Sequence, residues 1–302
     1  MAYIKGGIGF ADRVTTVSAT YAREITHAQR SARASRACSR TRGSDLAGIA
    51  NGIDTRSWDP AQRPGAAGAL RRRRPAGKRD ARAALLAETG LRAGARTPVV
   101  AYVGRLAAQK GVDVLLDALD GIVALPAAVV VLGAGDATLR AGLARHARAR
   151  PDRVHVRFGF DEAFARRLYA GADMLVMPSR FEPCGLGQLN AMRYGTIPVV
   201  RRTGGLAETV VDTTPATLAE GTATGFHFDA DTAAGLVAAL RRARGYFVKP
   251  TQWRRLVDHA MRRDSSWARS ARAYLDLYGA AVHDRGRALR INRPGTTRHL
   301  PP

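Results

Sequence analysis

The sequence predicts an α/β protein built on a doubly wound parallel sheet. From Pro98 onward, short apolar runs alternate with longer segments whose apolar residues recur at helical spacing. The apolar runs are nearly continuous, which is typical of parallel strands that helices cover on both faces. Repeated strand–helix units of this kind predict a Rossmann-like sheet, and ligands of such sheets bind beyond the carboxyl ends of the strands.

The expected elements follow one another in a regular order. Residues 11–18 predict a short strand, and 21–25 predict the start of a helix. The strands of the main sheet are expected at 98–104, 127–132, 154–158, 173–177, 197–200 and 225–228. Helices are expected near 112–119, 137–148, 162–169, 184–194, 231–244, 250–263 and 266–281.

The strongly basic composition suggests a nucleic-acid-binding protein as one hypothesis. The 302 residues carry 48 basic and 25 acidic side chains, a formal charge of +23. The basic residues are spread along the chain without interleaved aromatics, and almost all are arginine. We therefore interpret them as solvated surface residues and expect no specific nucleic-acid partner, although non-specific binding to polyanions is expected. The lysines are Lys5, Lys78, Lys110 and Lys249.

Hydropathy and cysteine usage indicate the compartment. No run of about 18 apolar residues occurs, so we expect no membrane span. The N-terminus lacks the apolar stretch of a secretory signal. Cys38 and Cys184 form neither a disulfide framework nor a metal-ligand spacing, so we expect no metal. These features together predict a cytoplasmic protein.

Two strand-to-helix junctions lie close together within residues 177–212. In the first, Glu182 precedes the run Cys184-Gly185-Leu186-Gly187, and in the second Thr203 precedes Gly204-Gly205. Backbone N–H groups at such junctions are unpaired and suit phosphate. Glu182 is then expected to face whatever these amides hold.

Two cations are expected at the carboxyl end of the strand 98–104. Arg105 and Lys110 occur in Gly-Arg-Leu-Ala-Ala-Gln-Lys-Gly, directly after that strand. A guanidinium and an ammonium can neutralise a diphosphate, the first as a fork and the second as a point charge.

These motifs resemble those of the bacterial glycogen synthase and plant starch synthase family. The resemblance lies in Ser-Arg-Phe-Glu-Pro-Cys-Gly-Leu at 179–186, in Arg-Arg-Thr-Gly-Gly-Leu at 201–206 and in Leu-Ala-Gly-Ile-Ala-Asn-Gly-Ile-Asp at 46–54. It covers roughly residues 8–26 and 43–281. It implies a retaining glycosyltransferase of the two-Rossmann-domain type that passes glucose from ADP-glucose to the non-reducing end of an α-1,4-glucan such as glycogen.

The resemblance also assigns roles to individual residues. Glu182 matches the family's active-site glutamate, which positions glucose and stabilises charge, and Arg105 and Lys110 match the cations that hold the ADP phosphates. Phe160 is expected either to stack near the base or to be a core aromatic. Gly187 departs from the family's Thr or Asn and removes a side-chain contact. The expected donor-binding positions are Gly133, Gly135, Phe160, Cys184, Gly185, Leu186, Gly187, Thr203, Gly204 and Gly205.

The resemblance predicts a division of the chain with only a remnant of the N-terminal domain. Because the acceptor-binding part has no counterpart here, we expect nucleotide binding but little or no transfer. No cofactor is expected besides the donor substrate, and the sequence leaves the oligomeric state open. The expected parts are an N-terminal remnant (1–26), a basic irregular segment (27–45), a crossover linker (46–77), a nucleotide-sugar-binding domain (78–265), a crossing helix (266–284) and a disordered tail (285–302).

Three alternatives stay open at this stage. Residues 27–42 lack apolar periodicity, which suggests either a frameshift or a diverged basic loop, and a frameshift would favour a decayed, non-functional product. Another retaining glycosyltransferase of this fold, using a UDP- or GDP-sugar, is the second alternative. A basic nucleic-acid-binding protein, supported by net charge alone, is the third.

Overall fold

A six-stranded parallel sheet forms the centre of the molecule. The computed structural model describes residues 3–27, 43–61 and 75–291. The strand order β5-β4-β3-β6-β7-β8 confirms the doubly wound α/β prediction, because the chain starts in the middle of the sheet and builds outward in both directions. The strands are β3 (Val99–Val103), β4 (Ala128–Gly133), β5 (Val154–Phe158), β6 (Met174–Met177), β7 (Ile197–Arg201) and β8 (Phe226–Phe228).

Successive strand residues face two separate hydrophobic cores. In β3, Val100 and Tyr102 belong to one core, whereas Val99 and Ala101 belong to the other. The alternation follows from the period of two in a β-strand. Both faces are apolar because helices cover both faces, which explains the continuous apolar runs in the sequence.

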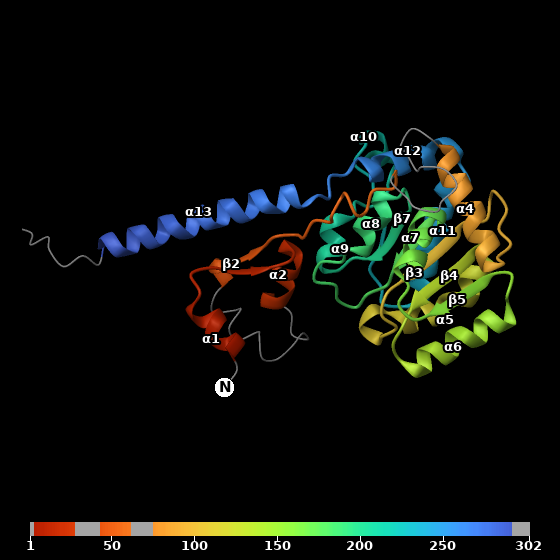
Figure 1. Cartoon of the computed structure of the whole chain (residues 1–302), viewed down its shortest axis with the longest axis horizontal. Coiled ribbons are helices and arrows are strands. Elements are labelled where there is room, and N and C mark those ends of the chain that lie inside the picture. Colours follow the sequence, from red (N-terminus) through yellow and green to blue (C-terminus); the bar gives the residue numbers. More distant parts are fainter. Residues whose placement is uncertain (1–2, 28–42, 62–74, 292–302) are drawn as a thin grey trace, which may run out of the picture.

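Each core is completed by helices on its own side of the sheet (Figure 1). α5 (Val112–Ala124) and α11 (Ala233–Phe247) pack together over one face, with α12 (Pro250–Arg262) beside them. α4 (Pro75–Thr89) and α7 (Glu162–Gly171) cover the other face. The remaining helices of this unit are α6 (Ala137–Ala149), α8 (Gly187–Arg193), α9 (Gly204–Thr209) and α10 (Pro215–Glu220).

The N-terminal residues form a small unit beside the sheet. It contains α1 (Tyr3–Phe10), α2 (Ala19–His27), the 3-10 turn η1 (Gly43–Asp45) and a parallel pair of strands, β1 (Val14–Thr16) and β2 (Leu46–Gly48). α2 packs against α9 of the main unit. The long helix α13 (Trp267–Ile291) extends away from the sheet and passes this small unit (Figure 1).

Three expected boundaries differ in the structure. α4 begins at Pro75, inside the segment expected to be linker, and its apolar residues Ala81 and Leu85 belong to a core. α8 begins at Gly187 instead of near Cys184, because Gly185 has a left-handed φ of 66° that a helix cannot contain. α13 continues to Ile291, beyond the expected start of the disordered tail.

Some predictions fall outside the described residues. Residues 28–42 carry the frameshift hypothesis, 62–74 belong to the expected linker, and 292–302 end the expected tail. Within the part of the chain that the structure describes, no helix is both long enough and apolar enough to cross a membrane.

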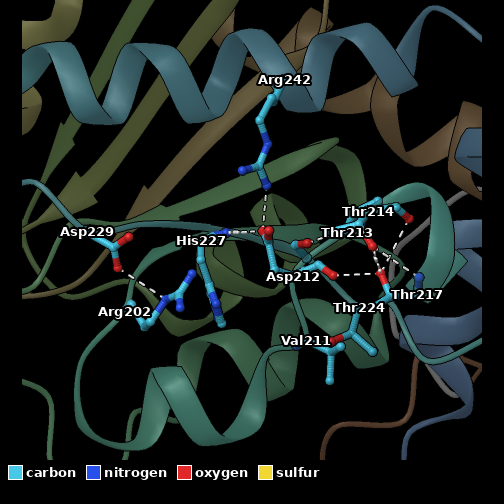
Figure 2. Close-up of polar contacts among 11 residues, drawn as sticks. Arg202, Val211, Asp212, Thr213, Thr214, Thr217, Thr224, His227, Asp229 and Arg242 are labelled. Carbon is cyan, nitrogen blue, oxygen red and sulfur yellow. Dashed lines mark hydrogen bonds and ion pairs between the residues drawn. The ribbon is translucent and has the colours of Figure 1, made fainter.

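A polar network fixes the edge strand β8 and the loops around it (Figure 2). The carboxylate of Asp212 accepts hydrogen bonds from the backbone N–H of His227 (2.7 Å) and from Arg242 of α11 (2.6 Å). Arg202, which follows β7, pairs with Asp229 at 3.1 Å. These contacts fix the segment before α9, the segment between α9 and α10, and the segment after α10. The backbone of His227 is part of this network.

Candidate active site

A cavity of about 810 Å³ opens at the carboxyl ends of β3, β4 and β6. This is the edge where a doubly wound sheet binds its ligands. Its lining contains most of the predicted site residues, which come from loops far apart in the sequence. The predicted residues that line it are Arg105, Lys110, Gly133, Phe160, Glu182, Cys184, Gly185, Leu186 and Gly187.

An ion pair lies at the centre of the cavity lining. Lys110 Nζ donates to Glu182 Oε2 at 2.5 Å, and Ser179 Oγ lies 3.2 Å from the same oxygen. Glu182 is only 5% exposed. A buried carboxylate is costly unless it is paired and hydrogen-bonded, and Lys110 and Ser179 supply these contacts.

The loop that carries Lys110 is fixed against the loop that carries Glu182. Lys110 ends the 3-10 turn η2 (Ala108–Lys110), and Gly111 follows with a left-handed φ of 66°. A Cβ on Gly111 would lie 1.9 Å from the carbonyl oxygen of Pro178, so only glycine permits this close approach. Arg180 donates its backbone N–H to the Gln109 carbonyl at 2.9 Å, which joins the two loops a second time.

Arg180 anchors the same junction through its side chain. Its guanidinium forms two parallel hydrogen bonds of 2.7 Å to the carboxylate of Asp113, in the first turn of α5. The pairing with Asp113 raises the pKa of Arg180, and it lowers the pKa of Asp113. Such bidentate pairs add geometric definition as well as attraction, so the loops that carry Lys110 and Glu182 are held together from outside the cavity.

Arg105 stands at the mouth of the cavity with its guanidinium in solvent. Its Nη2 donates to Gln109 Oε1 at 3.2 Å, and its carbonyl accepts from the Tyr102 hydroxyl at 2.7 Å. Burial raises the pKa of Tyr102, with the nearby Glu182 charge as a second cause, so this hydroxyl keeps its proton as a donor. The structure thus places one exposed cation and one partly buried cation beside one cavity.

The residues that follow Glu182 line the cavity and include the buried thiol of Cys184. Gln188 holds this turn, since its side-chain amide donates to the carbonyls of Cys184 (3.1 Å) and Gly185 (2.8 Å). Burial raises the pKa of the Cys184 thiol, which disfavours the nucleophilic thiolate. Cys184 therefore lines the cavity as a small, largely buried residue.

Phe160, Gly133 and Gly135 lie at different positions relative to the cavity. Phe160 is 94% exposed at the rim of the cavity, so its interpretation as a core aromatic is wrong, and stacking stays a prediction. Gly133 lines the cavity, whereas Gly135 does not. A Cβ on Gly135 would lie 2.2 Å from the Leu106 carbonyl oxygen, so Gly135 serves the packing of the Arg105 loop.

Thr203, Gly204 and Gly205 also lie outside the cavity lining. Gly205 N–H donates to the carbonyl of Glu182 at 2.9 Å. Gly204 N–H donates to the carboxylate of Glu24 at 2.7 Å. In this structure these amides donate hydrogen bonds to protein oxygens, and the turn packs against the backbone of Glu182.

Sequence reasoning missed several lining residues. Ser179 is the first residue of the motif at 179–186, so its position three residues before Glu182 could have suggested it. Tyr102 sits inside an apolar strand, and its polar hydroxyl was the one available signal. Asn51, Trp58 and Tyr169 also line the cavity, but they come from segments with no local motif for a ligand.

The residues that form the sheet and most of the cavity match a known protein family. Residues 91–245, which contain β3 to β8 and both loops of the ion pair, match the family described as glycosyl transferases group 1. The chain belongs to this family. Residues 1–38 match the starch synthase catalytic domain, and that match extends into the basic segment after α2.

Relatives and solved structures agree with this membership. Over 92% of this chain, it is 47% identical to the glycogen synthase of Thioalkalivibrio sulfidiphilus and 48% identical to that of Anaeromyxobacter dehalogenans. The catalytic domain of starch synthase IV from Arabidopsis thaliana, solved with ADP and acarbose, is 36% identical over 93% of this chain, with a TM-score of 0.85. The chain spans 57–58% of the length of these relatives and 58% of that solved chain.

Proposed function

We propose that this glycosyltransferase chain binds ADP-glucose as the donor part of a glycogen (starch) synthase. The parent reaction moves glucose to the non-reducing end of an α-1,4-glucan with retention of configuration. The observation that carries the proposal is the Lys110–Glu182 pair beside Arg105 at the carboxyl edge of the sheet. Two cations and one carboxylate in one cavity suit a ligand with a diphosphate at one end and a sugar at the other.

In this proposal, the cations and the carboxylate act on different parts of the donor. The bond between the anomeric carbon and the distal phosphate oxygen breaks, and the acceptor hydroxyl forms the new bond to that carbon as its proton passes to the departing phosphate. Arg105 and Lys110 neutralise the charge that develops on the departing ADP. Glu182, no longer paired with Lys110, accepts hydrogen bonds from glucose hydroxyls and stabilises positive charge at the anomeric carbon.

ADP is the proposed nucleotide because of the relatives. The starch synthase IV structure with bound ADP shares 36% identity with this chain. A structure with bound UDP and glucose, that of Anabaena HepE, shares 17% identity, a level that supports the fold alone. A glucan acceptor and a cytoplasmic location belong to the same proposal.

The first test is nucleotide binding by the purified 302-residue chain. We expect isothermal titration to give a smaller Kd for ADP and ADP-glucose than for UDP, GDP and their sugars. Tighter binding of UDP or GDP would favour the alternative donors. Binding of polyanions that ADP does not displace, without any nucleotide binding, would favour the nucleic-acid alternative.

The second test is transfer of labelled glucose from ADP-glucose to glycogen, with Glu182→Ala as the control. We expect little transfer, because the chain corresponds to 58% of the length of its relatives and catalysis needs donor and acceptor held together. Strong transfer that disappears in Glu182→Ala would show that the described residues contain a sufficient site.

A further inference from the structure

A glutamate of the N-terminal unit contacts the turn that packs against the backbone of Glu182. Glu24, on α2, accepts hydrogen bonds at Oε1 from the backbone N–H of Gly204 (2.7 Å) and from Thr203 Oγ1 (3.3 Å). These residues begin α9, on the main unit. The carboxylate therefore satisfies an N–H group at the start of that helix, where no intrahelical partner exists.

The turn that Glu24 holds is in direct contact with the backbone of Glu182. Gly205 N–H donates to the Glu182 carbonyl at 2.9 Å. A Cβ on Gly204 would lie 2.0 Å from that same carbonyl oxygen, and one on Gly205 would lie 2.1 Å from the Cys184 carbonyl oxygen. Because no space separates the two segments, a shift of the start of α9 must shift the backbone that carries Glu182.

A second carboxylate makes the reverse contact. Glu208, on α9, accepts at Oε2 from the backbone N–H groups of Ala19 (2.8 Å) and Thr20 (3.3 Å), in the first turn of α2. Each helix thus supplies the anion for the N-terminus of the other, where the helix dipole favours negative charge. α9 has six residues, too few to be stable without such contacts.

We propose that Glu24 is a positioning residue that fixes the Thr203–Gly205 turn and, through it, the backbone of Glu182. Glu208 has a different role, because its contacts lie at the α2 end and do not reach Gly204. The positioning itself follows from contacts in the structure. Its consequence for the donor, that Glu24 acts on the sugar end and not on the nucleotide end, depends on the proposed function.

Amide hydrogen exchange tests the positioning without any ligand. In Glu24→Ala we expect the Gly204 and Gly205 amides to exchange about tenfold faster, as expected from the loss of one charge-assisted hydrogen bond. Glu24→Gln keeps an acceptor oxygen and should restore slow exchange. Glu24→Asp keeps the charge on a shorter side chain and should behave like Glu24→Ala, which provides a second variant if the alanine protein does not fold.

Glu208→Ala is the matched control. It breaks the other contact of the same helix pair, so we expect faster exchange at Ala19 and Thr20 with little change at Gly204. Equal loosening of Gly204 in Glu208→Ala would mean that any loss of α2 docking has this effect, and the specific role of Glu24 would be overturned. Unchanged exchange at Gly204 and Gly205 in both Glu24→Ala and Glu24→Asp would also overturn it.

Donor binding tests the consequence. In Glu24→Ala we expect the Kd of ADP-glucose to rise about fivefold or more, with the Kd of ADP changed less than about twofold, because Arg105 and Lys110 are not on this turn. An equal loss for both ligands would contradict a role at the sugar end. If the unmodified chain binds neither ligand, the proposed function fails, and the exchange experiment still decides the positioning.

Discussion

At the scale of single residues, the candidate site depends on the ion pair between buried Glu182 and partly buried Lys110. Glu182 is 5% exposed and forms an ion pair with Lys110. Removing one member of such a pair leaves the other buried without compensation, which costs more than the pair contributes. Arg105 is exposed, so its guanidinium is free to meet a ligand without leaving a buried partner.

Lys110→Ala should therefore weaken ADP binding strongly. The loss of a charge-assisted hydrogen bond to a phosphate is worth about 1.5–3 kcal/mol, or roughly 10- to 100-fold in Kd. Isothermal titration measures it, with Lys249→Ala, an exposed lysine before α12, as the control that should change nothing. A Kd for Lys110→Ala equal to that of the control would argue against a phosphate contact.

Gly204→Ala should destabilise the fold. Its φ is 44°, in the left-handed region, and the added Cβ would lie 2.0 Å from the Glu182 carbonyl oxygen. We expect a loss of about 2 kcal/mol or more in urea unfolding. Gly245→Ala, in α11 where nothing lies within 4 Å of the new Cβ, should instead gain about 0.5–1 kcal/mol. Similar effects from both substitutions would be inconsistent with this geometry.

At the scale of elements, helices with similar sequence patterns differ in how deeply their side chains are buried. α11 and α13 both carry apolar residues at helical spacing. Leu240 of α11 is 2% exposed and belongs to the core, whereas Leu275 of α13 is 67% exposed. The same residue type therefore contributes to stability in one helix and hardly at all in the other.

Alanine substitution should separate these two helices. Leu240→Ala should cost about 2–5 kcal/mol, through lost burial and a cavity, whereas Leu275→Ala should cost less than about 0.5 kcal/mol. Chemical denaturation of both variants measures the difference. A large loss for Leu275→Ala would mean that α13 packs against something in solution.

The edge strand β8 should make stability depend on pH. Burial lowers the pKa of His227 below its ordinary value of 6.5, against the smaller opposing effect of Asp212. The unfolded chain then binds a proton near pH 6.5 that the folded chain does not, so stability falls as the pH decreases through that value. Burial also lowers the pKa of His155 and His259, which adds in the same direction.

Urea midpoints at pH 7.5 and pH 5.5 measure this dependence. We expect a lower midpoint at pH 5.5 and a smaller difference in His227→Gln, because that variant has one buried imidazole fewer to protonate. An unchanged difference in the variant would show that His227 does not contribute.

At the scale of the whole molecule, the net charge of +23 acts on any polyanion. We expect heparin to bind with an affinity that falls by at least about tenfold between 50 and 200 mM salt, because bound counterions are released. ADP carries few charges, and its affinity should change much less. Fluorescence anisotropy of a labelled heparin, with ADP as competitor, measures both; displacement of heparin by ADP would place the polyanion in the donor cavity.

The parallel sheet could be predicted from the amino-acid sequence, because burial on both faces imposes continuous apolar runs at 98–104, 127–132 and 197–200. It also predicted Arg105, Lys110 and Glu182 as site residues from contiguous motifs that follow strands, and all three line one cavity in the structure. Local patterns are readable in this way since strand and helix periods act over a few residues.

The contacts between these residues could not be predicted from local sequence patterns. The pairing of Lys110 with Glu182, the exposure of Phe160 and the contact of Glu24 with Gly204 each depend on segments distant in sequence. From the sequence, the amides of Gly204 and Gly205 were expected to face a ligand. In the structure these glycines pack against the backbone of Glu182 and Cys184. Such contacts follow from how packed helices and loops exclude one another in space, which no local period records.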